Sequence, residues 1–166
     1  MYNYNFCSNC GEKFEKKSET FYLCPKCDFR IFLNPKPGTG AIIINNKNQI
    51  LMTKRSYNPG KDKWGIPGGF INPGESAPEA LTREIREETG LELNNFEYFG
   101  SYAGDYPYKN INYKVVNTYY LVKISKDIDV DLSDEATEYK FVDIDQIRIE
   151  DVVDDIKGAI AKLISK

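Results

Sequence analysis

The residues of this 166-residue chain that could do chemistry are concentrated in one acidic segment, from Gly69 to Leu91. Within it, Glu84, Glu87 and Glu88 are spaced so that their side chains share one side of a helix, because residues three and four positions apart are neighbours on a helical surface. Carboxylates this close repel one another unless a cation lies between them. Hard oxygen ligands suit Mg²⁺ or Mn²⁺, so the spacing indicates a divalent-metal site.

The absence of histidine from the chain narrows the chemistry further. It excludes Ser-His-Asp and Cys-His mechanisms, and it excludes histidine as a metal ligand or general base. Catalysis must therefore depend on carboxylates, lysine, tyrosine or a metal. Three glutamates taken alone are more often a solvated helix face than a metal site, so the surrounding residues must decide between these two interpretations.

A helix from Ser76 to Thr89 is expected to carry the carboxylates. Ser76 and Glu79 fit a capping box, Pro78 falls in the first turn, and Gly90 is a suitable stop. An apolar stripe with a spacing of four residues lies away from the carboxylates and is expected to face the core. Its residues are Ala77, Leu81 and Ile85.

Short apolar runs predict a mixed sheet with helices on its faces, which is an α/β fold. A hairpin is expected where Ala41–Ile44 and Gln49–Thr53 flank a polar turn. The later strands and a closing helix are expected at Phe96–Tyr102, Tyr113–Ile124, Glu138–Val142 and Asp151–Ile164.

The acidic segment, read in full, resembles the sequence box of the Nudix hydrolase family. In that box a glycine and five intervening residues precede a glutamate, seven residues then precede Arg-Glu-aliphatic, and Glu-Glu and Gly-aliphatic pairs follow. Every position is met between Gly69 and Leu91, and the likeness extends over roughly residues 40–166. The resemblance implies an α/β/α sandwich, and it implies a pyrophosphohydrolase.

The resemblance also implies roles for the residues of the box. Glu84, Glu87 and Glu88 would be ligands of the catalytic Mg²⁺ or Mn²⁺, joined by the carbonyl group of Gly69. Arg83 would hold these carboxylates in place, and the box glutamate Glu75 would fix the loop and helix through a salt bridge to Arg83.

The general base is sought among the same carboxylates and in a second acidic loop. A metal-bound water would attack phosphorus, and a carboxylate would take its proton. Glu87 and Glu88 are candidates, and family members often place another acidic residue before the strand that begins near Tyr139. We favour Glu135 over Glu138 for that position.

Four further residues are candidates for contact with the substrate: Arg55, Trp64, Tyr102 and Tyr108. Arg55 ends a predicted strand, where it could contact phosphate or be a surface arginine. Trp64 belongs to the glycine-rich lead-in to the box, where a tryptophan is more often core or cavity wall than a base stacker. The two tyrosines, and Tyr106 between them, could stack on a base, although tyrosines in a hairpin more often pack against the sheet.

All four cysteines lie near the N-terminus, as two Cys-x-x-Cys pairs separated by 13 residues: Cys7, Cys10, Cys24 and Cys27. This spacing is typical of a zinc ribbon. A four-thiolate site leaves no open coordination position, so the predicted Zn²⁺ is structural. The proline-rich connector Asn34–Gly38 then separates a zinc ribbon at residues 1–36 from a Nudix domain at residues 37–166.

A ribbon placed before such a domain resembles the NADH pyrophosphatase branch of the family. That branch follows the box with a Ser-Gln-Pro-Trp-Pro-Phe-Pro-like segment, whereas Ser101–Lys109 lacks the tryptophan and two of the prolines. Pro107 lies roughly where ADP-ribose pyrophosphatases carry a proline. The expected reaction is hydrolysis of a nucleoside diphosphate linked to another group, with ADP-ribose-like substrates ahead of NADH and dinucleoside polyphosphates.

The net charge of −3 gives no electrostatic case for wide nucleic-acid or membrane binding. The ribbon is also close to neutral once four thiolates and zinc are counted, so a scaffold or dimerisation role, and hence a homodimer, is the favoured interpretation. The alternatives are a non-catalytic nucleotide-sensing Nudix module, which an intact box disfavours, and an RNA-cap hydrolase, which the charge disfavours. Without an N-terminal leader or an apolar run of membrane length, the expected location is the cytoplasm.

Overall fold

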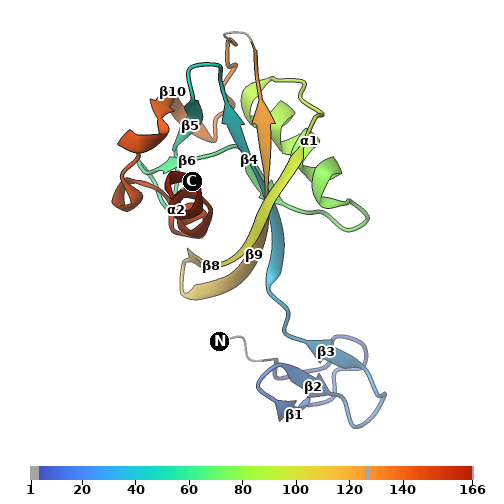
Figure 1. Ribbon diagram of the computed structural model, residues 1–166. Coiled ribbons are helices and arrows are strands. Elements are labelled where there is room, and N and C mark those ends of the chain that lie inside the picture. Colours follow the sequence, from blue (N-terminus) through green and yellow to red (C-terminus); the bar gives the residue numbers. More distant parts are fainter. Residues whose placement is uncertain (1–3, 126–127, 166) are drawn as a thin grey trace.

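The computed structural model describes residues 4–125 and 128–165, which form two separate sheets (Figure 1). The smaller sheet has the order β1-β2-β3 and is antiparallel. Its strands are β1 (Glu15–Ser18), β2 (Phe21–Leu23) and β3 (Arg30–Phe32). It has a core of its own, built by Cys7, Phe14, Tyr22 and Cys24.

The larger sheet has seven strands and is mixed, as the sequence predicted. They are β4 (Lys36–Ile44), β5 (Gln49–Arg55), β6 (Trp64–Gly65), β7 (Gly68–Phe70), β8 (Glu97–Tyr108), β9 (Ile111–Lys123) and β10 (Ala136–Asp143). The main order is β10-β5-β4-β9-β8, with β6 beside β5 and β7 beside β4. Only β4 and β9 are parallel among these pairs. The predicted boundary between residues 36 and 37 falls at the start of β4 and stays a prediction.

Helices α1 (Ala77–Thr89) and α2 (Lys157–Ile164) lie on opposite faces of the large sheet (Figure 1). Because side chains alternate along a strand, β4 serves both faces. Ile43 packs in one core cluster with Leu81 of α1, and Ile42 packs in the other with Ile160 of α2. The expected α/β/α arrangement is confirmed. Within the described part of the chain, no helix has the length and apolar character needed to cross a membrane.

The ends of α1 are set by local sequence, as predicted. The backbone N–H and the hydroxyl of Ser76 donate to the Glu79 carboxylate at 2.8 and 2.7 Å, which closes the capping box. Gly90 adopts the left-handed conformation, and its N–H donates to the Arg86 carbonyl group. The helix that carries the box carboxylates therefore has a fixed length and register.

The prediction of a helix from Asp151 is wrong in its first half. Two short 3-10 turns, Ile149–Asp151 and Asp154–Ile156, precede α2. Between them, Val153 donates its N–H to the Trp64 carbonyl oxygen at 3.0 Å, and both this valine and its neighbour Val152 are buried in the core. Pairing with β6 holds the backbone extended there, and this long-range contact overrides the helical periodicity of the sequence.

Gly68 lets β7 lie close to β4. Its φ of 149° is in the region that favours glycine, and a Cβ there would lie 2.6 Å from the Gly40 Cα and would also clash with the Thr39 carbonyl oxygen. Since Gly69 and the start of the acidic segment follow directly, this close approach sets where the segment begins.

We expect Gly68→Ala to lower the free energy of unfolding by about 3 kcal/mol, because it combines backbone strain with a clash against a neighbouring strand. Denaturant unfolding followed by circular dichroism would measure this loss. Gly74→Ala is the matched control, because Gly74 also has a positive φ, 92°, but has open space where its Cβ would be. It should lose only about 1 kcal/mol. Equal losses in the two variants would contradict the importance of the close approach.

Candidate functional site

A cavity of about 280 Å³ lies where β4, β5, β7, β9 and α1 converge. Four carboxylates contribute to its lining, namely Glu84, Glu88, Glu135 and Asp155. Arg55 adds a positive charge to the same lining. A cavity with this excess of negative charge is suited to a cation, and to an anionic ligand that arrives with one.

The Arg83 guanidinium connects the loop after β7 to α1. It donates to both oxygens of the Glu75 carboxylate, at 2.8 and 2.9 Å, which confirms the predicted salt bridge. It also donates to Glu84 at 2.7 Å, to Glu87 at 3.1 Å and to the Phe70 carbonyl oxygen at 3.1 Å. With its donors occupied in this way, Arg83 holds the acidic groups together and lies outside the cavity lining.

These contacts perturb the acidity of the groups involved. Hydrogen bonds from Arg83, and then from the Asn72 backbone N–H, hold the pKa of Glu75 at about 2. Burial raises the pKa of Glu84, with the neighbouring guanidinium opposing the shift. Burial raises the pKa of Glu88 to about 8, although the Gly68 N–H donates to its carboxylate at 3.1 Å. Glu88 is therefore a half-buried acid whose ionised form needs a positive charge nearby.

The box residues fit a divalent cation by their chemistry and packing. The Glu84 carboxylate covers Gly69, so that a Cβ at Gly69 would lie 2.6 Å from a carboxylate oxygen. Glu87 is exposed and lies outside the cavity lining. In residues 4–125 and 128–165, the three box glutamates do not form a compact ligand cluster, because Arg83 already bridges Glu84 and Glu87. A divalent cation bound here would supply the positive charge that the ionised carboxylate of Glu88 needs.

The second acidic loop reaches the same cavity. Glu135 belongs to the lining, and its carboxylate accepts a hydrogen bond from the Tyr57 hydroxyl at 2.6 Å. Glu138 lies on β10 outside the lining, with a carboxylate oxygen 3.6 Å from the Lys54 ammonium group. The geometry thus brings the residue favoured by sequence to the cavity and leaves the other on the sheet.

Of the four predicted substrate contacts, only Arg55 lies in the cavity lining. Trp64 lies outside that lining, and its ring lies under two ammonium groups, those of Lys140 at 3.8 Å and Lys54 at 5.8 Å from the ring centroid. The half-buried ring also packs against the core cluster on the α2 side of the sheet, so it is a core residue and not part of the cavity wall.

The two tyrosines singled out in the sequence are also outside the lining. The Tyr102 ring packs 6.0 Å from the Tyr119 ring, against the start of α2. Tyr108 is exposed at the end of the β8–β9 hairpin beside Lys109. Tyr106, the third tyrosine considered in this hairpin, does belong to the lining.

Tyr57, Asn117 and Asp155 are among the polar residues of the lining that sequence analysis missed. The amide of Asn117 lies 3.4 Å from the Asp155 carboxylate, whose pKa is raised by burial. Asp155 lies in the stretch that was wrongly predicted as helix, which hid its direction. Asn117 interrupts a run of apolar and aromatic residues in β9, and the structure shows that it is buried. Since buried polar side chains nearly always have a polar partner, an amide inside such a run could have been predicted to face a polar site.

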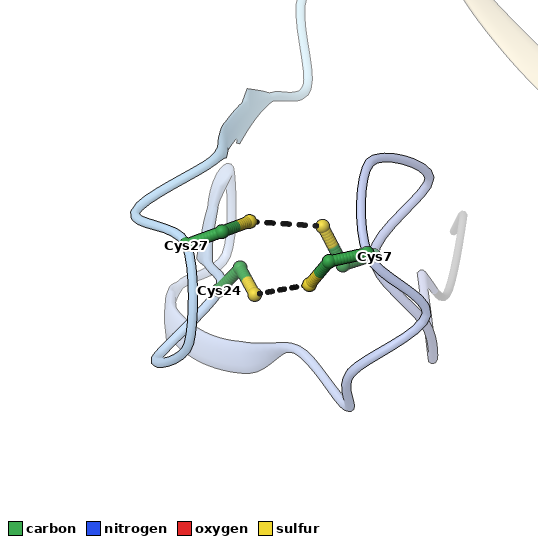
Figure 2. Close-up of side chains that lie close together, drawn as sticks. Cys7, Cys24 and Cys27 are labelled. Atoms are coloured by element: carbon green, nitrogen blue, oxygen red, sulfur yellow. Dashed lines mark hydrogen bonds between the residues drawn. The ribbon is translucent and has the colours of Figure 1, made fainter.

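The four cysteines form a separate candidate metal site in the small sheet. All four sulfur atoms lie within 4.8 Å of one another, and Figure 2 shows those of Cys7, Cys24 and Cys27 converging. The sulfur atoms of Cys7 and Cys27 are 3.7 Å apart, and those of Cys10 and Cys24 are 3.5 Å apart. A tetrahedral zinc with bonds of about 2.3 Å separates its sulfurs by about 3.8 Å, so the arrangement fits one such ion.

Comparisons with known proteins assign the part of the chain that forms the large sheet to one protein family. A profile of the NUDIX domain matches residues 34–163. An ADP-ribose pyrophosphatase of Methanocaldococcus jannaschii is 32% identical over 140 residues, which are 82% of this chain and 78% of that protein. The NAD-capped RNA hydrolase NudC of Pseudomonas fluorescens is 31% identical over 106 residues, which are 63% of this chain and 38% of NudC.

The solved structures agree with the sequence matches. The crystal structure of a NUDIX hydrolase from Nitrosomonas europaea superposes with a TM-score of 0.65 at 28% identity, and covers 90% of this chain and 83% of that one. A MutT protein from Methanosarcina mazei gives a TM-score of 0.63 at 27% identity, and covers 77% of this chain and 91% of that one. The NUDIX profile match includes every strand of the seven-stranded sheet and the whole of α1.

Glu88 should make the metal-free protein less stable as the pH rises. Its folded pKa of about 8 lies above the ordinary value of 4.5, so the protonated form stabilises the fold fully below about pH 4.5 and this stabilisation is lost as the pH rises through about 8. We expect a lower denaturation midpoint near pH 8 than near pH 6, and a larger gain from Mg²⁺ or Mn²⁺ at the higher pH. Glu88→Gln is the control. An unchanged pH dependence in that variant would contradict the prediction.

Cys24→Ser should abolish zinc binding and unfold the small sheet, because Cys24 is fully buried in a core that consists largely of the cysteine cluster. Zinc content measured by atomic emission should fall from about one ion per chain to near zero. Ser8→Ala, a change at an exposed residue between two of the cysteines, should keep the metal. A Cys24→Ser protein with full zinc content would refute the assignment.

Proposed function

Because the chain belongs to the Nudix family of hydrolases, we propose that it cleaves the diphosphate linkage of an ADP-ribose-like substrate. The products would be a nucleoside monophosphate and a second phosphate compound. The observation that carries this proposal is the single cavity in which box carboxylates, Arg55 and Glu135 come together. The grouping supports this function because the carboxylates can bind a metal or take a proton, and the Arg55 guanidinium beside them can hold phosphate.

The box residues provide the site for the catalytic metal. Glu84 and Glu88 would be its ligands inside the cavity, with Glu87 at the rim and the Gly69 carbonyl group beside them. When bound, Mg²⁺ or Mn²⁺ neutralises the diphosphate and lowers the pKa of a coordinated water. Arg83 keeps the ligands oriented, because its guanidinium is bound on several sides by the acidic segment.

The remaining charged groups of the cavity have distinct tasks. Arg55 would bind a phosphate oxygen, which holds the linkage in place. Glu135 would accept the proton of the attacking water, because its carboxylate belongs to the lining and has no cationic partner within hydrogen-bonding distance among the described residues. The base would then come from the loop before β10, and the glutamate ligands of the metal from α1.

A second cavity supports a substrate with a group on each side of its diphosphate. It has a volume of about 250 Å³ and shares Arg55, Tyr106, Val153 and Asp155 with the first. A nucleoside in one cavity and a sugar in the other would leave the linkage at Arg55, between them. A nucleoside triphosphate has no second group to fill this space.

The relatives agree with this choice of substrate class. The M. jannaschii protein, named an ADP-ribose pyrophosphatase, matches most of both chains, whereas NudC is matched over 38% of its length. An NAD-linked substrate is the second candidate, favoured by the NudC likeness and by the cysteine cluster. Structural Zn²⁺ in the ribbon is part of the same proposal, and a homodimer stays a prediction.

The proposal predicts metal-dependent release of AMP and ribose 5-phosphate from ADP-ribose. Purified protein with Mg²⁺ or Mn²⁺ would be incubated with ADP-ribose, NADH, NAD⁺, diadenosine polyphosphates, nucleoside triphosphates and NAD-capped RNA, and products identified by mass spectrometry. Preference for another linked nucleotide would change the substrate class. Tight binding of one compound without turnover would instead favour a nucleotide sensor.

Glu84→Gln should lower kcat about 100-fold or more, since it removes a ligand of the metal that stabilises the transition state. Glu92→Gln is the matched control, because this exposed glutamate lies just beyond α1. Circular dichroism and zinc content should be unchanged in both variants. Full activity of the Glu84→Gln protein would remove the metal-ligand assignment.

A further inference from the structure

Tyr57 makes a direct contact with the side chain assigned as general base. Its hydroxyl donates to one carboxylate oxygen of Glu135 at 2.6 Å, although the two residues are 78 positions apart. They meet because β5 and β10 pair antiparallel, with Arg55 opposite Ala136. Each residue lies just past that final pair, so the sheet brings the two loops together at the cavity.

The backbone of the Glu135 loop is fixed by other contacts. The Ser56 N–H donates to the Glu135 carbonyl oxygen at 2.9 Å, and the Ser56 hydroxyl donates to the Asp134 carbonyl oxygen at 2.6 Å. These bonds do not involve the Tyr57 side chain. The Tyr57 hydroxyl therefore acts on the orientation of the Glu135 carboxylate and not on the position of its loop.

The Tyr57 ring is itself held in place. The Arg55 guanidinium lies 5.2 Å from the ring centroid, in a cation–π contact that does not need the hydroxyl group. Burial, and then the hydrogen bond to Glu135, raise the pKa of the Tyr57 phenol, so it keeps its proton and remains a donor at neutral pH. The Glu135 carboxylate cannot donate in return while ionised, so the direction of the bond is fixed.

We propose that Tyr57 is a positioning residue that holds one oxygen of Glu135, so that the other oxygen is turned to the attacking water. The inference rests on the proposed function, because it requires Glu135 to be the general base. In the step concerned, the water oxygen bonds to phosphorus and its proton passes to the free oxygen of Glu135. The electron pair of the broken P–O bond leaves with the second phosphate group, and Tyr57 keeps its own proton.

The neighbouring charges explain why such a donor is needed. Glu135 is exposed, and it repels the ionised forms of Glu84 and Glu88 across the cavity. An unrestrained carboxylate in that field would turn toward solvent. A hydrogen bond from the Tyr57 hydroxyl counters this tendency, because it selects one rotamer of Glu135.

The test is Tyr57→Phe in the full chain with Mn²⁺, assayed on ADP-ribose. Removing the hydroxyl keeps the ring over Arg55, so kcat should fall about 10-fold while KM changes less than about twofold. A change of structure alone would raise KM together with the fall in kcat, so the split between the two constants is the readout. Tyr98→Phe, at an exposed tyrosine outside the cavity, should match the unmodified protein.

A double-mutant cycle separates the possible outcomes. In the Glu135→Gln background, Tyr57→Phe should cause no further loss of kcat, because the base that it orients is gone. An equal loss in both backgrounds, or no loss in either, would overturn the positioning role and leave the proposed function intact. Full activity of Glu135→Gln alone would instead show that the base assignment itself is wrong. Unchanged thermal unfolding in each variant would exclude misfolding as the cause.

Discussion

The ion-pair network of Arg83 is the interaction on which the acidic segment depends. A single guanidinium contacts three carboxylates and the carbonyl group of Phe70, and so joins β7, the following loop and α1. Without it, like charges on adjacent turns would force the helix and the loop apart. In the described part of the chain, Glu88 has no cationic side chain at hydrogen-bonding distance, and its carboxylate accepts from the Gly68 N–H instead. The network therefore stabilises the segment, while the half-buried Glu88 still needs a cation to balance its charge.

The sheet determines which distant residues can join this segment. The β5–β10 pairing delivers Tyr57 and Glu135, and the β8–β9 hairpin delivers Tyr106 and Asn117. The 3-10 turn that carries Asp155 is held at the edge of β6 by the bond from Val153 to Trp64. Asn117 comes from the middle of β9, whereas Tyr57, Glu135 and Asp155 come from segments that flank the strands. The same strands also supply the apolar residues of the two cores.

The sequence predicted well those features that depend on interactions between residues close together in the chain. The helix α1 could be predicted with its ends, because the capping box of Ser76 and the stop at Gly90 are local signals. The salt bridge from Glu75 to Arg83 also came from a local pattern. Tyr57 and Asp155 could not be found in this way, because their places in the cavity depend on strand pairing and on a backbone bond to Trp64. The same bond made the start of the last helix unpredictable from periodicity.

The carboxylates that line the cavity have a thermodynamic consequence for its ligands. With four acidic side chains against the charge of Arg55, a diphosphate entering alone meets repulsion, and a divalent cation entering alone lacks phosphate oxygens to complete its coordination. Each ligand removes the obstacle to the other. Linkage requires this effect to be reciprocal, so the cation raises nucleotide affinity by the same factor by which the nucleotide raises cation affinity. The two therefore enter as a cooperative pair, with the affinity of either one set by the concentration of the other.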